Sequence, residues 1–170
     1  KESTYGTEPT AGTGNGERFG EVDSESFATR FDMLTRADIS RPLVAKSVTG
    51  TEYSEGGVSL AMQVDDFVGN MLYAFFPQDS AGIYPSWTVR VGREAKEHTY
   101  TGMMANSLSI SASVGEYVMM SVDFVGKAES ATGTVATATF DGAALDALHF
   151  ADGTVKFDDG SGSAPAASAS

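Results

Sequence analysis

The sequence contains no cysteine, and this absence removes two classes of chemistry. Without thiols the chain forms no disulfide bond and offers no thiolate to a metal ion or to a nucleophilic mechanism. The sequence also has no run of about 18 apolar residues, the length that a membrane-spanning helix needs. We therefore expect no membrane insertion and a fold that is stabilised by packing alone.

Basic residues are scarce, because 11 Lys and Arg stand against 23 Asp and Glu and give a formal net charge of -12. Phosphate binding requires a positive surface that releases counterions, so direct binding to nucleic acid is disfavoured. Few lysines among abundant Ala, Gly, Ser, Thr and Val also occur in proteins that work at high salt, which suggests a halophilic host. An ordinary acidic protein that uses its charge for solubility explains the composition equally well.

The length of 170 residues fits one domain with a tail at each end. Residues 1–20 are rich in glycine and threonine and predict an extended arm that a partner would order. Residues 158–170 form a Gly/Ser/Ala run of linker composition. The folded domain is therefore expected over residues 21–157.

Alternation of apolar and polar residues predicts that most of this domain is β-sheet. Residues 58–64 alternate after a predicted turn at Gly56-Gly57, and residues 87–91 alternate in the same way. Residues 27–34 fit either a helix face or a strand, and we predict a strand. A last strand is expected over residues 148–158.

Residues 107–126 carry the clearest local pattern, two alternating runs on either side of Gly115. A three-residue loop, 115–117, would pair residue 114 with 118 and residue 110 with 122, and would place both apolar sets on one face. The other face of this predicted hairpin is small and polar: Ser107, Ser109, Ser111, Ser113, Met119, Ser121 and Asp123.

One helix is predicted between Asp65 or Asp66, which can cap it, and Pro77, which stops it. Its apolar stripe should lie across the sheet and consists of Phe67, Met71, Leu72 and Phe75. Gly69 weakens this helix by about 1 kcal/mol relative to alanine. This glycine either allows close packing at that point of the helix or has no structural role.

A search for catalytic or metal-binding groups finds no convergent set. His98 and His149 lack a paired metal spacing, and we interpret them as surface or sheet-face residues. Glu94, Glu97 and Asp123 could act as acids or bases, but carboxylates lie near one another by chance in so acidic a chain. We therefore predict no enzyme activity and no cofactor.

The partly basic segment around Arg36 and Arg41 could touch DNA. Two arginines in a connection more often pair with carboxylates of a neighbouring surface. We interpret the segment as a contact with a neighbouring surface.

Eight short segments, taken in order, resemble the tail tube proteins of long-tailed bacterial and archaeal viruses. They are residues 2–7 (ESTYGT), 24–26 (SES), 48–50 (VTG), 56–60 (GGVSL), 65–76 (DDFVGNMLYAFF), 100–102 (YTG), 106–112 (NSLSISA) and 122–127 (VDFVGK). The resemblance implies a mainly β fold, a β-sandwich or barrel-like domain with one flanking helix and an extended N-terminal arm.

The resemblance also implies rings that stack into a tail tube, through which viral DNA passes without specific binding. We expect six copies per ring, or three if a duplicate domain exists, with the tape measure and tail terminator proteins as partners. The protein would be assembled in the host cytoplasm and located in the virion tail. The alternative is an acidic β-sandwich that decorates a virion or cell surface, or binds there.

Two sets of site residues follow from the resemblance. The candidates for the lumen are Ser107, Ser109, Ser111, Ser113, Glu116 and Asp123. The candidates for contacts between rings are Tyr5, Arg36 and Arg41.

Overall fold

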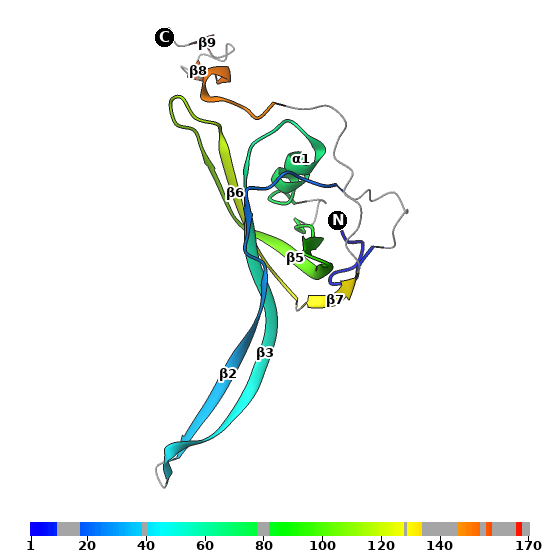
Figure 1. Ribbon diagram of the computed structural model, residues 1–170, viewed down its shortest axis with the longest axis vertical. Coiled ribbons are helices and arrows are strands. Elements are labelled where there is room, and N and C mark those ends of the chain that lie inside the picture. The colour runs from blue at the N-terminus through cyan, green and yellow to red at the C-terminus, as the bar shows by residue number, and fades with distance from the viewer. Residues whose placement is uncertain are drawn as a thin grey trace.

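The computed structural model confirms a mainly β protein with one α-helix (Figure 1). It describes residues 1–9, 18–38, 41–77, 82–127, 129–133, 146–153, 156–157 and 166–167. The strands are β1 (Ser24–Glu25), β2 (Ala28–Asp38), β3 (Arg41–Ala61), β4 (Trp87–Arg93), β5 (Lys96–Ser111), β6 (Met119–Gly126), β7 (Glu129–Gly133), β8 (Lys156–Phe157) and β9 (Ala166–Ala167). The helix is α1 (Asp66–Tyr73), and η1 (Phe150–Asp152) is a single 3-10 turn.

Seven strands form one curled antiparallel sheet. Its order is β1-β3-β6-β5-β4, with β2 also on β3 and β7 also on β5. The long strand β5 pairs with β4 and β7 through its first half and with β6 through its second half. A register shift against β4 coincides with Gly102, whose φ of 67° is the left-handed conformation of a glycine bulge. Such a bulge bends a strand, and here it turns the sheet into a half-barrel.

The concave side of this sheet holds the hydrophobic core, and α1 lies across it. Asp65 caps the helix, since its side chain accepts a hydrogen bond from the amide of Val68 at 2.7 Å. The predicted helix is confirmed, with Met71 buried and the rest of its predicted apolar stripe packed against the core. The buried apolar core residues are Phe27, Val58, Leu60, Val68, Met71, Tyr100, Met103, Met120, Val122 and Phe124.

Strands β2 and β3 continue beyond the body as a two-stranded ribbon, residues 30–38 and 41–53 (Figure 1). Strand β6 pairs with β3 only from Ser54 to Ala61, so in the described structure this part of β3 has β2 as its partner. The strand predicted over residues 27–34 is thereby confirmed, and it extends to Asp38.

The predicted turn at Gly56-Gly57 is wrong, because both glycines lie inside β3. Their role is close approach. A Cβ at Gly56 would lie 2.4 Å from the Cα of Phe27, and one at Gly57 would lie 2.6 Å from the carbonyl oxygen of Val122. The two glycines therefore let the backbone at Phe27, between β1 and β2, and at Val122, in β6, lie unusually close beside β3.

The predicted hairpin exists, but its register differs by two residues. Ile110 pairs with Met120 and Ser111 with Met119, so residues 112–118 form a seven-residue connection in place of the expected three-residue loop. Both registers have the same parity, so the predicted division into an apolar face and a serine-rich face holds.

The predicted last strand is only partly correct. Residues 150–152 form η1, and the strand that follows is limited to β8, which pairs with β9. Val155 lies outside the described residues. Gly69 has no close neighbour to explain it, because a Cβ added there would meet no described atom within 4 Å.

Candidate assembly surfaces

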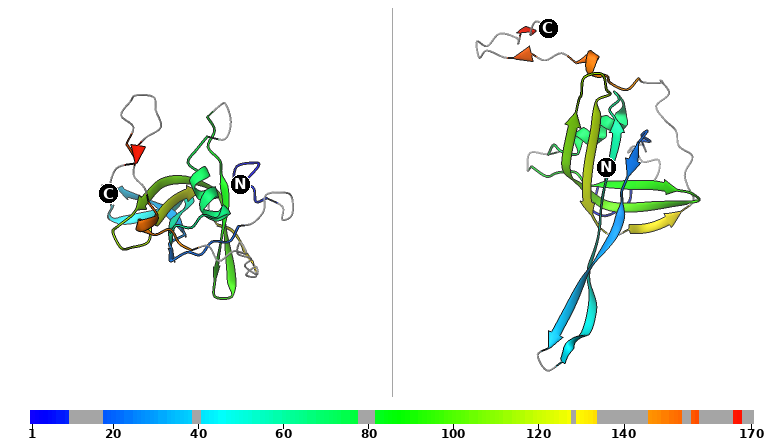
Figure 2. Two further views of the ribbon diagram at one scale, coloured as in Figure 1. Left: turned by 90° about the horizontal axis from the view of Figure 1, so that it is seen from above. Right: turned by 60° about the vertical axis from the view of Figure 1, so that its left-hand side comes forward.

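The convex side of the sheet carries a surface of small side chains, which we call the serine face. Its central row crosses four strands, because Ser24 pairs with Ser59, Ser59 with Ser121 and Ser121 with Ser109. Two further rows flank it, and together the serine face consists of Ser24, Gly57, Ser59, Ala61, Ser107, Ser109, Ser111, Met119, Ser121 and Asp123. Figure 2 shows β3, β6 and β5 side by side in the right-hand view.

Asp123 is the one ionisable residue among these ten. Its Oδ2 accepts a hydrogen bond from the hydroxyl of Ser107 at 2.6 Å. Its Oδ1 occupies the space above Gly57, 2.4 Å from where a Cβ would stand. Beside the serine face Arg30 forms an ion pair with Glu55 at 3.0 Å, so that cation is already neutralised. The surface is therefore hydroxylated and slightly acidic.

Four of the six predicted lumen residues, Ser107, Ser109, Ser111 and Asp123, come together on this face. Ser113 and Glu116 do not, since they lie in the exposed connection between β5 and β6. That both sets face the lumen remains a prediction.

Several stretches of strand have an unpaired edge in the described structure, and two of them belong to the long strands β5 and β2. The second half of β5, residues 104–111, pairs with β6 on one side, while β4 and β7 pair only with its first half. Likewise β2 pairs with β3 on one side only. Unpaired edges are templates for strand addition, so both can accept a strand from another chain.

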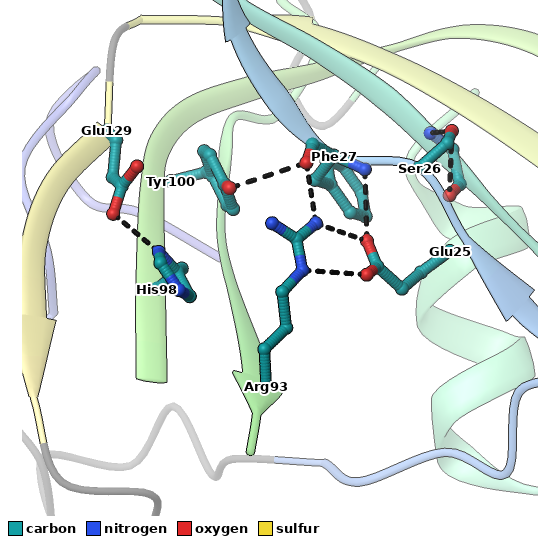
Figure 3. A network of polar contacts seen from close by, with 8 residues as sticks. Glu25, Ser26, Phe27, Arg93, His98, Tyr100 and Glu129 are labelled. Carbon is teal, nitrogen blue, oxygen red and sulfur yellow. Dashed lines mark hydrogen bonds and ion pairs between the residues drawn. The ribbon is translucent and has the colours of Figure 1, made fainter. Parts of the chain in front are cut away.

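A polar network joins the first strand of the sheet to the last (Figure 3). Arg93 at the end of β4 donates two hydrogen bonds to the carboxylate of Glu25 on β1, at 2.8 and 2.7 Å, and a third to the carbonyl of Phe27 at 2.6 Å. The hydroxyl of Tyr100 donates to the same carbonyl at 3.4 Å. The network therefore holds the half-barrel in its curled shape.

The hydrogen bonds from Arg93 hold the pKa of the Glu25 carboxyl below its ordinary value, while Glu25 raises the pKa of Arg93. Burial raises the pKa of the Tyr100 hydroxyl. No local sequence pattern indicated this network, because Glu25 and Arg93 are 68 residues apart.

This ion pair should make stability depend on pH. Because the pKa of Glu25 is lowered on folding, the pair contributes fully above the unfolded value of about 4.3 and loses its contribution as the pH falls through the folded value. Arg93→Met should therefore lower the free energy of unfolding at pH 7, and the difference from the parent protein should shrink below about pH 4. Urea denaturation from pH 7 to 3 measures this.

Arg30→Met is the matched control, because the Arg30–Glu55 pair is exposed and should contribute about 1 kcal/mol or less. A deficit of Arg93→Met that stayed constant over the whole pH range would contradict the role of Glu25.

The first residues of the chain are held against the body by a buried carboxylate. Glu2 is 5% exposed and accepts hydrogen bonds from the amides of Gly6 and Gly102 and from the hydroxyls of Ser86 and Thr88, all at 2.7–2.8 Å. The sequence pattern did not reveal this contact, since the predicted arm has few apolar residues and Glu2 binds through polar atoms alone.

Tyr5 lies beside this contact. Its ring sits under the ammonium group of Lys127, 5.5 Å from the ring centre, and would be 3.1 Å from a Cβ on Gly102. It is 53% exposed, so the predicted ring-to-ring contact of Tyr5 stays a prediction. The arm expected over residues 1–20 and the tail over 158–170 also stay predictions, because residues 10–17 and most of the tail lie outside the described part.

Arg36 and Arg41 lie in the outer part of the ribbon, where Arg36 pairs with Lys46 and Arg41 with Asp38 in strand register. Their assignment to a contact between rings remains a prediction.

The two histidines have ordinary partners. Nδ1 of His98 on β5 lies at hydrogen-bond distance from Oε1 of Glu129 on β7, 2.7 Å away, and His149 packs edge-on against Tyr117. Within the described residues, no three His, Asp or Glu side chains come close enough together to hold a metal ion. The same part of the chain contains no helix with the length and apolar character needed to cross a bilayer.

Comparison with known protein families identifies a match over the whole chain. A family model described as phage tail tube protein matches residues 1–170. No curated protein matches the chain.

Proposed function

This chain belongs to the phage tail tube protein family, and from that premise we propose that its copies close into rings that stack into a DNA-conducting tube lined by the serine face. Membership makes it a structural component of the virion tail and favours this role over a decoration or binding module. No catalytic step is part of the proposal.

The serine face is the observation that supports the proposed DNA channel. Its ten residues include four cross-strand serines, a single carboxylate and no Lys or Arg. Cations at this surface would hold phosphates by releasing counterions, whereas hydroxyls and a carboxylate leave DNA free to slide. The overall charge of -12 supports the same passive transport.

The unpaired edges of β5 and β2 support ring closure. The free edge of β5, residues 104–111, can pair with the free edge of β2 in a neighbouring copy, so that the sheet continues from copy to copy. Each copy offers two different edges, and a contact between unlike surfaces closes into a ring when its rotation is right. We propose six copies per ring, with three if a duplicate domain exists.

Assembly is proposed to take place in the host cytoplasm, with the tape measure and tail terminator proteins as partners of the tube. DNA would be the passing cargo, bound without sequence preference.

The channel wall is tested by changing its charge at fixed positions. The double variant Ser109→Lys with Ser111→Lys should leave tubes intact and slow DNA release at least about tenfold. A protein with about 6–10 phosphate contacts loses about 10³–10⁵-fold in DNA affinity when salt rises from about 50 to 200 mM, so lysines at these positions should hold the DNA strongly. Ser109→Glu with Ser111→Glu is the matched control and should release DNA at the parental rate. Electron microscopy of virions and a DNA release assay supply the readouts.

If the lysine variant released DNA as fast as the glutamate variant, with normal tubes in both, the serine face would not line the channel.

A further inference from the structure

The long strand β5 bends at Gly102, and its two halves belong to different parts of the sheet. The first half pairs with β4 and β7, and the second half pairs with β6. In the right-hand view of Figure 2 the β4–β5 hairpin extends to one side, whereas β3 and β6 run upright. The angle at Gly102 therefore sets how the two parts of the sheet lie relative to each other.

The backbone amide of Gly102 finds its acceptor outside the sheet. Trp87 lies opposite Met103 and Val89 lies opposite Tyr100, so β5 has one residue more than β4 at this point. Gly102 is buried, and its amide donates to Oε1 of Glu2 at 2.8 Å. A buried amide without an acceptor destabilises a fold, so the bend depends on this carboxylate.

Glu2 holds β4 at the same point. Its carboxylate also accepts hydrogen bonds from the hydroxyls of Ser86 and Thr88, each at 2.8 Å, and its backbone amide donates to the carbonyl of Ser86 at 2.9 Å. One buried carboxylate thus joins β4 to β5 at the bulge. A change of the angle there would break hydrogen bonds that water cannot replace in a buried site.

The end of β6 contacts the same bend. The amide of Lys127 donates to the carbonyl of Thr101 at 3.1 Å, and a Cβ at Gly126 would lie 2.8 Å from the carbonyl oxygen of Gly102. Tyr5 lies beside Gly102 as well, with its ring centre 5.5 Å from the ammonium group of Lys127. Residues 2–6 therefore contact both parts of the sheet where they meet.

We propose that residues 2–6 brace the bend of β5, with Glu2 as the positioning residue that fixes the curvature of each copy. A contact between unlike surfaces closes into a ring only when the rotation from copy to copy is right. Fixed curvature within each copy therefore gives rings of one diameter and a channel of one width. The inference rests on the proposed ring assembly and adds what sets the diameter.

The bend can be measured in single copies, because the chain has no cysteine of its own. Spin labels at Ala95→Cys, in the exposed turn between β4 and β5, and at Ser111→Cys, at the far end of β5, report the distance across the bend. Pulsed electron spin resonance of the labelled parent should give one narrow distance. Glu2→Leu should broaden it by about 5 Å or more, because a change of about 10° at Gly102 moves the end of a half-strand about 30 Å long by that amount.

A milder variant supplies the same test if Glu2→Leu does not fold. Ser86→Ala with Thr88→Val removes the two hydroxyl donors on β4 and leaves Glu2 bonded to Gly102. The distance should broaden in this variant too, by less than in Glu2→Leu.

Two controls separate the brace from a general loosening of the fold. Glu8→Ala removes an ion pair with Arg90 on β4, so it loosens the same segment away from the bend. Val68→Ala removes buried methyl groups from α1, where Val68 is 2% exposed, and lowers stability outside the brace. Both controls should keep the narrow parental distance.

Electron microscopy then relates the bend to the ring. The parent should form rings of one diameter, and Glu2→Leu should form rings of several diameters or open arcs. Uniform rings of Glu2→Leu together with a broadened label distance would overturn the link between bend and ring.

A parental label distance in folded Glu2→Leu or in the milder variant would overturn the brace itself, and so would equal broadening in either control. If the parent formed no rings at all, the proposed function would fail, while the label distance in single copies would still decide whether Glu2 holds the bend.

Discussion

Gly56→Ala should lower the free energy of unfolding by about 3 kcal/mol or more. This is one of the two largest effects that we expect from a single substitution. Gly56 has φ of 155°, and its Cβ would lie 2.4 Å from the Cα and 2.6 Å from the backbone nitrogen of Phe27. Both neighbours are backbone atoms of a residue that is itself buried in the core, so neither can move aside alone. Urea denaturation followed by circular dichroism measures the loss.

Gly69→Ala is the matched control for this substitution. The same methyl group, added in the middle of α1 where it meets no described atom within 4 Å, should stabilise the protein by about 1 kcal/mol. A Gly56→Ala variant as stable as the parent would show that β3 and the segment at Phe27 are farther apart than the structure has them.

Glu2→Leu should cost about 2–4 kcal/mol and release the first residues of the chain. The carboxylate accepts four hydrogen bonds, and its removal leaves the buried amide of Gly102 without an acceptor. Hydrogen exchange at Gly102 and limited proteolysis near Tyr5 should both become faster, which separates release of the segment from general unfolding.

Glu2→Gln tests the same site with the shape preserved. One amide oxygen can still accept from Thr88 and Gly102, while the NH₂ group meets the donor of Gly6, so an intermediate loss is expected. Parental stability and protease resistance in Glu2→Leu would contradict the holding role of this carboxylate.

Local patterns in the sequence predicted the elements of the fold well. Alternation identified the strands around Val58, Val89 and Val122, and the cap at Asp65 with the stop at Pro77 bounded the helix. These signals come from residues a few positions apart, where backbone geometry dictates which side chains share a face.

Pairings across longer distances could not be predicted in the same way. The three-residue loop at Gly115 and the observed seven-residue connection put the same residues on the same face, so alternation could not separate them. Gly56-Gly57 has the composition of a turn, and the close approach of the Phe27 backbone beside β3 explains why the strand needs glycine at Gly56.

For the candidate site, alternation in the sequence grouped six serine-face residues of the β5–β6 hairpin: Ser107, Ser109, Ser111, Met119, Ser121 and Asp123. It could not add Ser24 and Ser59, which reach the same row through β1 and β3. The Glu25–Arg93 pair and the Glu2 contact were missed for the same reason, since each joins residues that the chain separates by 68 to 100 positions.

Those separations also set an order of events during folding. The ribbon is a local hairpin, and hairpins form in about 1–10 μs. The body needs β4 and β5 before Arg93 can meet Glu25 and Gly102 can meet Glu2, and folds dominated by such distant pairings take about milliseconds to seconds. A newly made chain therefore pairs β2 with β3 many times before the curled sheet forms, and this pairing becomes lasting only when β3 is held by the body.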